Sequence, residues 1–335
     1  MNRRDEGDLM RIPGIYGDIK LLAGTSNPSL AEEISAYLSR RCGAPVPLAG
    51  REIRKFPNDN TFVSLAESVR GQDVYLIQSI TRPVNDMLME LLITLDAVRR
   101  DSAGRITAVI PYMAYGRTDK KDQPRTPITA RLVADMIQIA GADRYMTIDL
   151  HAMQIQGFFS IPGDVLTARY LLRDYVKANV PLENTVVTTV DLGYAKGGRW
   201  WARDLNLPLA FIEKKREGEK TSARSLIGTV TGNNVLLVDD EIDTAGSLEE
   251  AVALLDKEGA QEITVAFTHA VFSPPALERL ARLQSRVREF IFTNTIPLAP
   301  EDRLPNMTIL SVADLLGEVI WRAHKGISVG AMFNE

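Results

Sequence analysis

The sequence predicts an α/β protein made of two similar lobes, each with a mainly parallel sheet flanked by helices. Three observations predict this class. Short β-branched apolar runs alternate with longer helical patterns, as in βαβ units. That alternation occurs twice along 335 residues, which exceeds the usual single-domain size of about 100 to 200 residues. A hydrophobic share of 45% also suffices for a large core.

The first half predicts a set of buried strands separated by helices. The strand-like runs are residues 19–23, 74–79, 106–112 and 145–150. Asn27 followed by Pro28 opens the first helix, because a capping side chain followed by proline is the usual order at a helix start. A second helix spans residues 84–99, whose leucines recur on one face, and Thr126-Pro127 opens a third.

The second half repeats the alternation. Its strand-like runs are residues 186–190, 209–213, 235–238, 263–267 and 290–293. The segment 157–166 separates the two alternations, so we expect one lobe over residues 1–160 and a second over 161–310, followed by a C-terminal helix and tail over 311–335. The helix at 313–325 has an apolar face and must pack on one lobe, but the sequence leaves open which.

Composition excludes several classes of protein. The 39 basic and 43 acidic residues give a net charge of −4, whereas proteins that mainly bind nucleic acid usually carry a basic excess. Cys42 is the only cysteine, which rules out an internal disulfide and fits a reducing compartment. The first eleven residues alternate charges instead of forming a signal sequence, and no apolar run reaches the roughly 20 residues of a membrane span. We therefore expect a cytoplasmic protein.

The most informative motif is an acidic segment that follows the strand at 235–238. It contains Asp239, Asp240, Glu241 and Asp243, and leads through Thr244, Ala245, Gly246 and Ser247 into a helix at 248–257. Strand ends of an open parallel sheet form the ligand crevice, and the N–H groups of a helix start favour a phosphate. Gly246 lets the backbone approach an anion, and the carboxylates can accept hydrogen bonds from sugar hydroxyls. The alternative is that Asp243 and Ser247 only cap the helix and the other carboxylates are solvated.

This order of strand, paired aspartates and Thr-Ala-Gly resembles the phosphoribosyl-binding loop shared by phosphoribosyltransferases and ribose-phosphate pyrophosphokinases. Other segments favour the pyrophosphokinase family and cover nearly the whole chain. They are residues 27–31, 68–74, 83–85, 89–92, 110–112, 149–159, 214–216, 268–269, 293–294 and 311–313. The resemblance implies two phosphoribosyltransferase-like lobes, with a nucleotide site in the first. It implies a ribose-phosphate site in the second lobe, at Asp239, Asp240 and Asp243 to Ser247. It also implies Mg²⁺ as cofactor and a hexameric homo-oligomer.

The resemblance also assigns roles to single residues. It implies that His151 contacts the nucleotide phosphates and Mg²⁺, and that Asp191 helps to hold Mg²⁺. It implies that Lys214 and Arg216 are catalytic and lie on a loop that closes over the substrates. At Asp191 the match is partial, since Tyr194 stands where the family has the second of two glycines. His269 and the remaining histidine are interpreted as structural.

The predicted nucleotide site departs from the family. The family motif Phe-Ser-Asp-Gly-Glu reads Phe56-Pro57-Asn58-Asp59-Asn60 here, and an Arg-Gln-Asp motif reads Arg117-Thr118-Asp119. Phe56 can still stack on a base. Amides donate as well as accept hydrogen bonds, so Asn58 and Asn60 leave the base preference open. Residues 121–127 also differ in a segment linked to regulation by phosphate and ADP.

The predicted activity is transfer of the diphosphate of ATP to ribose 5-phosphate, giving phosphoribosyl pyrophosphate and AMP. Two alternatives remain. A phosphoribosyltransferase would consume phosphoribosyl pyrophosphate, but the nucleotide motifs of the first lobe disfavour it. A catalytically weak regulatory paralogue is compatible with the amide substitutions, whereas His151, Asp191, Lys214 and Arg216 favour catalysis.

Overall fold

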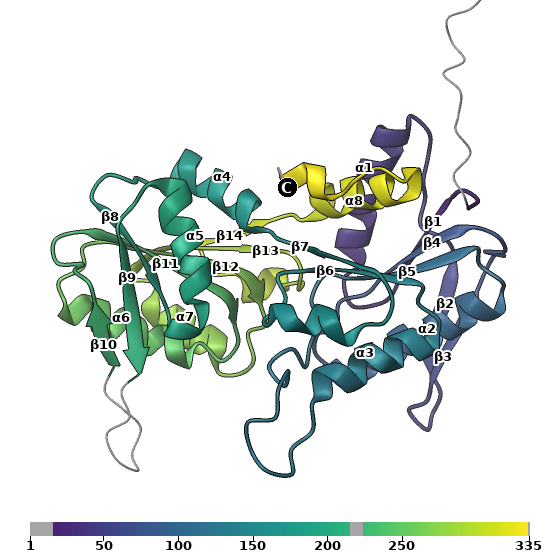
Figure 1. The fold of residues 1–335 in the computed structure, drawn as a ribbon, viewed down its shortest axis with the longest axis horizontal. Coiled ribbons are helices and arrows are strands. Elements are labelled where there is room, and N and C mark those ends of the chain that lie inside the picture. Colours follow the sequence, from purple (N-terminus) through teal and green to yellow (C-terminus); the bar gives the residue numbers. More distant parts are fainter. Residues whose placement is uncertain (1–15, 215–223, 334–335) are drawn as a thin grey trace, which may run out of the picture.

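The computed structural model of the protein describes residues 16–214 and 224–333 (Figure 1). Its first sheet is entirely parallel, in the order β1-β4-β5-β6-β7. The strands are β1 (Ile19–Ala23), β4 (Asp73–Ile77), β5 (Arg105–Ile110), β6 (Arg144–Ile148) and β7 (Gly163–Leu166). Helix α1 (Pro28–Cys42) covers one face, and α2 (Val84–Arg100) and α3 (Thr129–Ala140) cover the other (Figure 1).

Among the described residues, the second sheet has seven strands in the order β10-β9-β8-β11-β12-β13-β14, of which only β10 pairs antiparallel. The strands are β8 (Thr185–Thr189), β9 (Leu209–Lys214), β10 (Arg224–Ile227), β11 (Asn234–Ile242), β12 (Ile263–Ala270), β13 (Val287–Thr293) and β14 (Met307–Leu310). Helices α4 (Arg169–Asn179) and α5 (Ala195–Leu205) lie on one face, and α6 (Gly246–Lys257) and α7 (Ala276–Leu283) on the other (Figure 1). The predicted fold class is confirmed.

The predicted buried strands are all present, because continuous apolar runs are what a parallel sheet buries on both faces. Asn27 also caps α1 as expected, since its side chain accepts a hydrogen bond from the N–H of Leu30. The antiparallel hairpin of β2 (Arg51–Lys55) and β3 (Thr61–Leu65) was not predicted. Strand β7 pairs with β6, so the first sheet extends to Leu166, a few residues beyond the boundary expected at 160.

The two sheets share one hydrophobic cluster. It includes Leu21, Ile148, Val238, Ala266 and Ile291, which come from strands of both sheets. The cluster also includes apolar residues of α1, α4, α5 and the C-terminal helix α8 (Ala313–Lys325). The lobes are therefore joined by a common core.

Helix α8 packs against α1 and so belongs with the first lobe, which answers the question left open by the sequence (Figure 1). A buried polar network fixes its end. Asp73 on β4 is fully buried and accepts hydrogen bonds from Arg105 at 2.7 and 2.6 Å and from the Tyr75 hydroxyl at 2.9 Å. Nδ1 of His324 on α8 lies 2.8 Å from the same carboxylate.

Short 3₁₀ turns complete the fold: η1 (Met153–Phe158), η2 (Leu192–Tyr194), η3 (Pro300–Asp302) and η4 (Gly330–Phe333). The first two follow β6 and β8 directly and therefore flank the carboxyl edges of the two sheets. Across the described parts of the chain, every helix is too short or too polar to span a bilayer.

Candidate functional site

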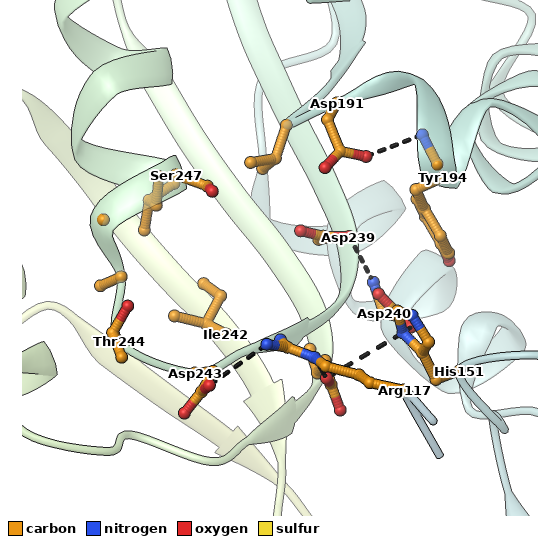
Figure 2. Close-up of a pocket in the computed structure, with 16 residues that line it drawn as sticks. Arg117, His151, Asp191, Tyr194, Asp239, Asp240, Ile242, Asp243, Thr244 and Ser247 are labelled. Atoms are coloured by element: carbon orange, nitrogen blue, oxygen red, sulfur yellow. Dashed lines mark hydrogen bonds and ion pairs between the residues drawn. The ribbon is translucent and has the colours of Figure 1, made fainter. Parts of the chain in front are cut away.

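A cavity of about 400 Å³ lies at the carboxyl ends of β6, β8 and β11, where the two lobes meet (Figure 2). The second lobe contributes Asp191 and the whole segment from Asp239 to Leu248, and the first lobe contributes Arg117 and His151. Residues distant in sequence therefore converge where open α/β sheets usually bind ligands.

The acidic segment is not the turn that the sequence suggested. Strand β11 continues through Asp239, Asp240 and Glu241 to Ile242, so the expectation that the strand ends at Val238 is wrong. Pairing with β8 stops at Val238 opposite Thr189, whereas pairing with β12 continues to Ile242 opposite Ala270. The carboxylates thus project from an ordered strand that extends beyond one of its neighbours.

Negative charge is crowded at this strand end. Burial, together with the charges of Asp240 and Asp191, raises the pKa of Asp239 well above its usual value. Burial would also raise the pKa of Asp240, but the hydrogen bond and charge of His151 lower it below its usual value. His151 Nδ1 lies 2.7 Å from Asp240 Oδ2, and that hydrogen bond raises the pKa of His151.

Arg117 connects the first lobe to the same strand (Figure 2). Its Nε donates to Glu241, and its Nη1 donates to Asp243 Oδ2 at 3.2 Å. Thr118, predicted beside it, lines neither this cavity nor the one described below, and its backbone takes part in the turn before α3. Of this pair, only Arg117 therefore reaches the cavity.

The start of α6 forms the opposite wall. Ala245, with a φ of 58°, precedes the helix, and within the described residues no side chain caps the first turn. The alternative that Asp243 and Ser247 cap this helix is therefore wrong, since Asp243 pairs with Arg117 instead. A helix start without a side-chain cap leaves N–H donors and a positive dipole end toward the cavity.

Arg279 on α7 supports this turn from outside the cavity. Its Nη1 donates to the carbonyl oxygen of Thr244 at 2.8 Å, and its Nε lies 3.3 Å from Glu249. A Cβ at Gly246 would come within 3.2 Å of the Arg279 guanidinium. Arg279 was not predicted from the sequence, because no local motif marks a residue that acts from a separate helix.

Asp191 and Tyr194 form the third wall (Figure 2). Asp191 Oδ1 accepts a hydrogen bond from the N–H of Gly193 at 2.7 Å, so it caps η2 and also lines the cavity. The Tyr194 ring lies so close to Gly197 that a Cβ there would be 2.3 Å from it. The residue that replaces the family's second glycine is thus held by packing at the cavity wall.

The hairpin residues Phe56, Asn58, Asp59 and Asn60 line neither cavity of this chain. Phe56 is 38% exposed and packs against Phe62 at a ring distance of 5.5 Å. The side chain of Asn58 accepts from the N–H of Asn60 at 3.3 Å, and Asp59 has a φ of 63°. These contacts shape the hairpin tip, and the nucleotide role of the four residues stays a prediction.

A second cavity of about 630 Å³ adjoins the first and shares Arg117, Glu241 and Asp243 with it. Its other walls include Tyr112 and Tyr115 after β5, and Arg82, Pro83 and Asn85 before and within the first turn of α2. Residues 83–85 and 110–112 match family motifs, but the sequence alone suggested no role for them. Their position after two neighbouring parallel strands was the available signal.

Among the predicted catalytic residues, Lys214 ends β9, which pairs with β10. Arg216 lies outside the described residues. Within residues 16–214 and 224–333, no group of three or more His, Cys, Asp and Glu side chains is arranged to hold a metal ion. Mg²⁺ typically takes one or two protein carboxylates and completes its shell with waters and substrate phosphates, so the crowded carboxylates fit that ion.

Comparison with known proteins agrees with this architecture. Residues 19–141 match the profile of the N-terminal domain of ribose phosphate pyrophosphokinase, and residues 203–334 match the phosphoribosyl synthetase-associated domain. Ribose-phosphate pyrophosphokinase 1, chloroplastic, of Arabidopsis thaliana is 46% identical over 94% of this chain and 77% of its own length. The Aquifex aeolicus ribose-phosphate pyrophosphokinase is 46% identical over 94% and 99%. The crystal structure of phosphoribosylpyrophosphate synthetase from Mycobacterium smegmatis superposes with a TM-score of 0.86 at 42% identity, over 92% of this chain and 99% of that one.

Proposed function

The chain belongs to the ribose-phosphate pyrophosphokinase family, and from that premise we propose that its cavity transfers the diphosphate of ATP to the anomeric hydroxyl of ribose 5-phosphate. The products are phosphoribosyl pyrophosphate and AMP. The anomeric hydroxyl releases its proton to water as its oxygen attacks the β-phosphorus, the bond from that phosphorus to the α–β bridging oxygen breaks, and AMP leaves.

This proposal is carried by one observation: two chemically different walls face each other across the cavity. One wall is the start of α6 without a side-chain cap, which favours a phosphate. The other holds the carboxylates of β11 together with Arg117 and His151 from the first lobe. A site that binds a sugar phosphate and must also accept a metal-bound triphosphate needs both.

The sugar phosphate binds at α6. The N–H groups of the first turn and the hydroxyls of Thr244 and Ser247 donate to its phosphate, and Asp239 and Asp240 accept from its ribose hydroxyls. Arg279 keeps the Thr244 carbonyl turned away from the phosphate by donating to it. Asp243 contributes indirectly, since it holds Arg117.

The nucleotide lies toward the first lobe. Its phosphates meet Arg117 and His151, and its nucleoside extends into the second cavity beside Tyr112 and Tyr115. Asp191 and His151 would contact Mg²⁺ together with waters and substrate phosphates, and the ion would neutralise phosphate charge when bound. His151 Nδ1 is engaged by Asp240, so its Nε2 is the atom that faces ligand.

Lys214 and Arg216 are proposed to donate to the transferred phosphoryl oxygens. Charge spreads over these oxygens in the transition state, so the contribution of the two side chains is electrostatic stabilisation. On this account Lys214→Ala and Arg216→Ala lower kcat far more than they raise the dissociation constants of the substrates. Weaker binding with unchanged kcat would contradict the assignment.

The direct test incubates the protein with ribose 5-phosphate, Mg²⁺ and each nucleoside triphosphate in turn, and measures release of the monophosphate. Release of AMP that depends on ribose 5-phosphate supports the proposal. Absence of release, with intact binding of both substrates, would instead support the regulatory paralogue.

The same assay tests the hairpin. If Asn58 and Asn60 contact the base, the Asn58→Asp, Asn60→Glu double variant changes the ATP-to-GTP preference by roughly 5- to 150-fold, which corresponds to a hydrogen-bond mismatch of about 1 to 3 kcal/mol. An unchanged preference removes them from base selection. The hairpin lines neither cavity of its own chain, so we propose that it contacts the base bound by a second copy of the chain. The resemblance implies a hexamer, and analytical ultracentrifugation would test that state. A cytoplasmic location also stays a prediction, which fractionation of cells would test.

A further inference from the structure

A buried contact between β12 and the end of β6 bears on the position of His151. His269 lies on β12, is 2% exposed and lines neither cavity. Its Nε2 is 3.1 Å from the carbonyl oxygens of both Ile148 and Asp149, and its Nδ1 is 2.9 Å from the Thr295 hydroxyl. Because carbonyl oxygens only accept hydrogen bonds, Nε2 carries the hydrogen in this arrangement.

Asp149 is the residue that this contact holds. Its φ of 39° lies in the left-handed region, which costs a non-glycine residue about 1 to 3 kcal/mol and persists only when surrounding contacts enforce it. Its N–H donates to the Leu166 carbonyl at 2.9 Å. Its carboxylate accepts from the N–H of Ala168 at 3.0 Å and from the Thr268 hydroxyl at 2.7 Å. The amide, the carbonyl and the carboxylate of Asp149 are therefore all engaged.

The turn at Asp149 leads to His151 two residues later, and His151 contacts Asp240 on β11. Strand β11 is in turn paired with β12, with Glu241 opposite His269. The contacts thus form a closed loop. Strand pairing joins β11 to β12, His269 joins β12 to the end of β6, and His151 joins that end back to β11.

We infer that His269 is a positioning residue: by holding the carbonyls of Ile148 and Asp149 it fixes the left-handed turn and so aligns His151 with Asp240. The inference depends on the proposed function only in the tests that measure turnover. A misplacement of about 1 Å at a reacting group can cost about 100-fold in rate, so a contact outside the cavity can control kcat.

The first test compares His269→Phe with His269→Gln. Phenylalanine removes both ring nitrogens and leaves two buried carbonyls without their donor, whereas the glutamine amide can replace Nε2–H. We expect His269→Phe to lower kcat about tenfold or more with little change in KM, and His269→Gln to recover most of it. Equal kcat for the two variants, or no loss in either, would overturn the inference.

The second test is a double-variant cycle with His151→Ala, because a merely structural role lowers stability in either background. If His269 acts through His151, His269→Phe loses its effect on kcat once His151 is absent. If the two losses multiply, the inference is wrong. Should His269→Phe not fold, Thr268→Val replaces it in the cycle, since it removes the contact that the preceding residue of β12 makes to the Asp149 carboxylate and must show the same coupling.

The third test needs no turnover and so separates this inference from the proposed function. The chain has 3 histidines, so its imidazole proton resonances can be assigned by substitution. In His269→Phe the His151 resonance should shift and in His269→Gln it should return toward its wild-type position, while that of His324, held by Asp73, should not move in either variant. An unmoved His151 resonance would overturn the inference even if the protein proved fully active. If the protein instead released no AMP, a shifted resonance would still support positioning. The matched control is His324→Gln, which should leave kcat unchanged.

Discussion

His151 with Asp240 in the cavity, and His324 with Asp73 beneath α8, are two histidine–aspartate contacts of nearly equal length, 2.7 and 2.8 Å. Their surroundings differ. Asp73 also receives both ends of the Arg105 guanidinium and the Tyr75 hydroxyl, and it is fully buried. Asp240 has another carboxylate beside it, and its histidine is 40% exposed.

The difference shows how one pair of side chains can serve structure or ligand binding. In the α8 network, Arg105 balances the charge of Asp73, and the partners saturate its oxygens. Among the described residues that line the cavity, the carboxylates of β11 and Asp191 outnumber the cationic side chains Arg117 and His151. A buried network in which positive and negative charges balance stabilises the fold. An open cluster with excess negative charge is instead stabilised when a cation binds to it.

The largest effect should come from breaking the balanced network. Asp73→Asn removes the charge that Arg105 and His324 contact, and removing one partner of a buried pair typically costs about 3 to 5 kcal/mol. We expect the free energy of unfolding, measured by urea titration, to fall by about 3 kcal/mol. The kcat of the folded fraction should not change. Asp135→Asn on α3 breaks an exposed ion pair and serves as the control. If Asp73→Asn lowered the free energy of unfolding by less than this control, our account of the network would be wrong.

Asp239→Asn should have the opposite effect, because it should lower activity but not stability. The crowding that raises the pKa of Asp239 opposes its ionised form, so an amide there should leave the free energy of unfolding unchanged or raise it. Loss of a charge that the bound ligands require should lower kcat/KM about 100-fold, which corresponds to about 2.7 kcal/mol. Asp204→Asn is the control, because Asp204 pairs with Arg173 and Lys177 outside the cavity. Lowered stability with full activity would reverse our assignment.

A smaller effect should arise at the phosphate wall. In Gly246→Val the added Cβ would lie 3.2 Å from Arg279 Nη1, so the guanidinium must shift, which disturbs its contact to the Thr244 carbonyl at the phosphate wall. We expect the dissociation constant of ribose 5-phosphate, measured by calorimetry, to rise about tenfold, or about 1.4 kcal/mol. Circular dichroism checks that the fold is intact. Unchanged affinity would place the sugar phosphate away from α6.

The smallest effects concern pH, and their signs differ between the two contacts. The pKa of Asp73 is lowered in the folded protein: burial opposes this, but the hydrogen bonds from His324 and Arg105 outweigh it. Its stabilising contribution is therefore present above the unfolded pKa and lost as pH falls through the folded one. The difference in unfolding free energy between wild type and Asp73→Asn should thus shrink below about pH 4, by at most about 1.4 kcal/mol for each further drop of one in pH.

For His151 the hydrogen bond to Asp240 raises the pKa, so its contribution is present at low pH and is lost as pH rises through the folded pKa. The stability difference between wild type and His151→Gln should therefore shrink as pH rises above the ordinary histidine pKa of about 6.5. Urea titrations across the pH range would measure both trends. Two trends of the same sign would remove the distinction between the contacts.

The sequence predicted the core strands because their apolar runs are continuous, as at Leu236 and Val265. It missed the β2–β3 hairpin, since Arg51–Lys55 carries only one apolar residue and neither face of that strand is buried in a core. It also stopped β11 at Val238, because three consecutive carboxylates are uncommon inside a strand and only pairing with β12 supports them.

The candidate site was anticipated in its local motifs and missed in its long-range contacts. Asp239, Gly246 and His151 stand in motifs that one sequence displays. The contact between Arg117 and Glu241 spans 124 positions, and that between His269 and Ile148 spans 121. Such pairings depend on how two sheets meet, which neither periodicity nor spacing encodes.

The hydrophobic cluster shared by both sheets has a consequence for unfolding. Residues such as Ile148 and Val238 belong to different sheets but to one buried cluster, so neither half of the chain could keep its part of that cluster from water if the other unfolded. Calorimetry should therefore give a single heat-absorption peak instead of one peak for each half. By the same reasoning, the halves expressed as separate polypeptides should aggregate unless they are produced together.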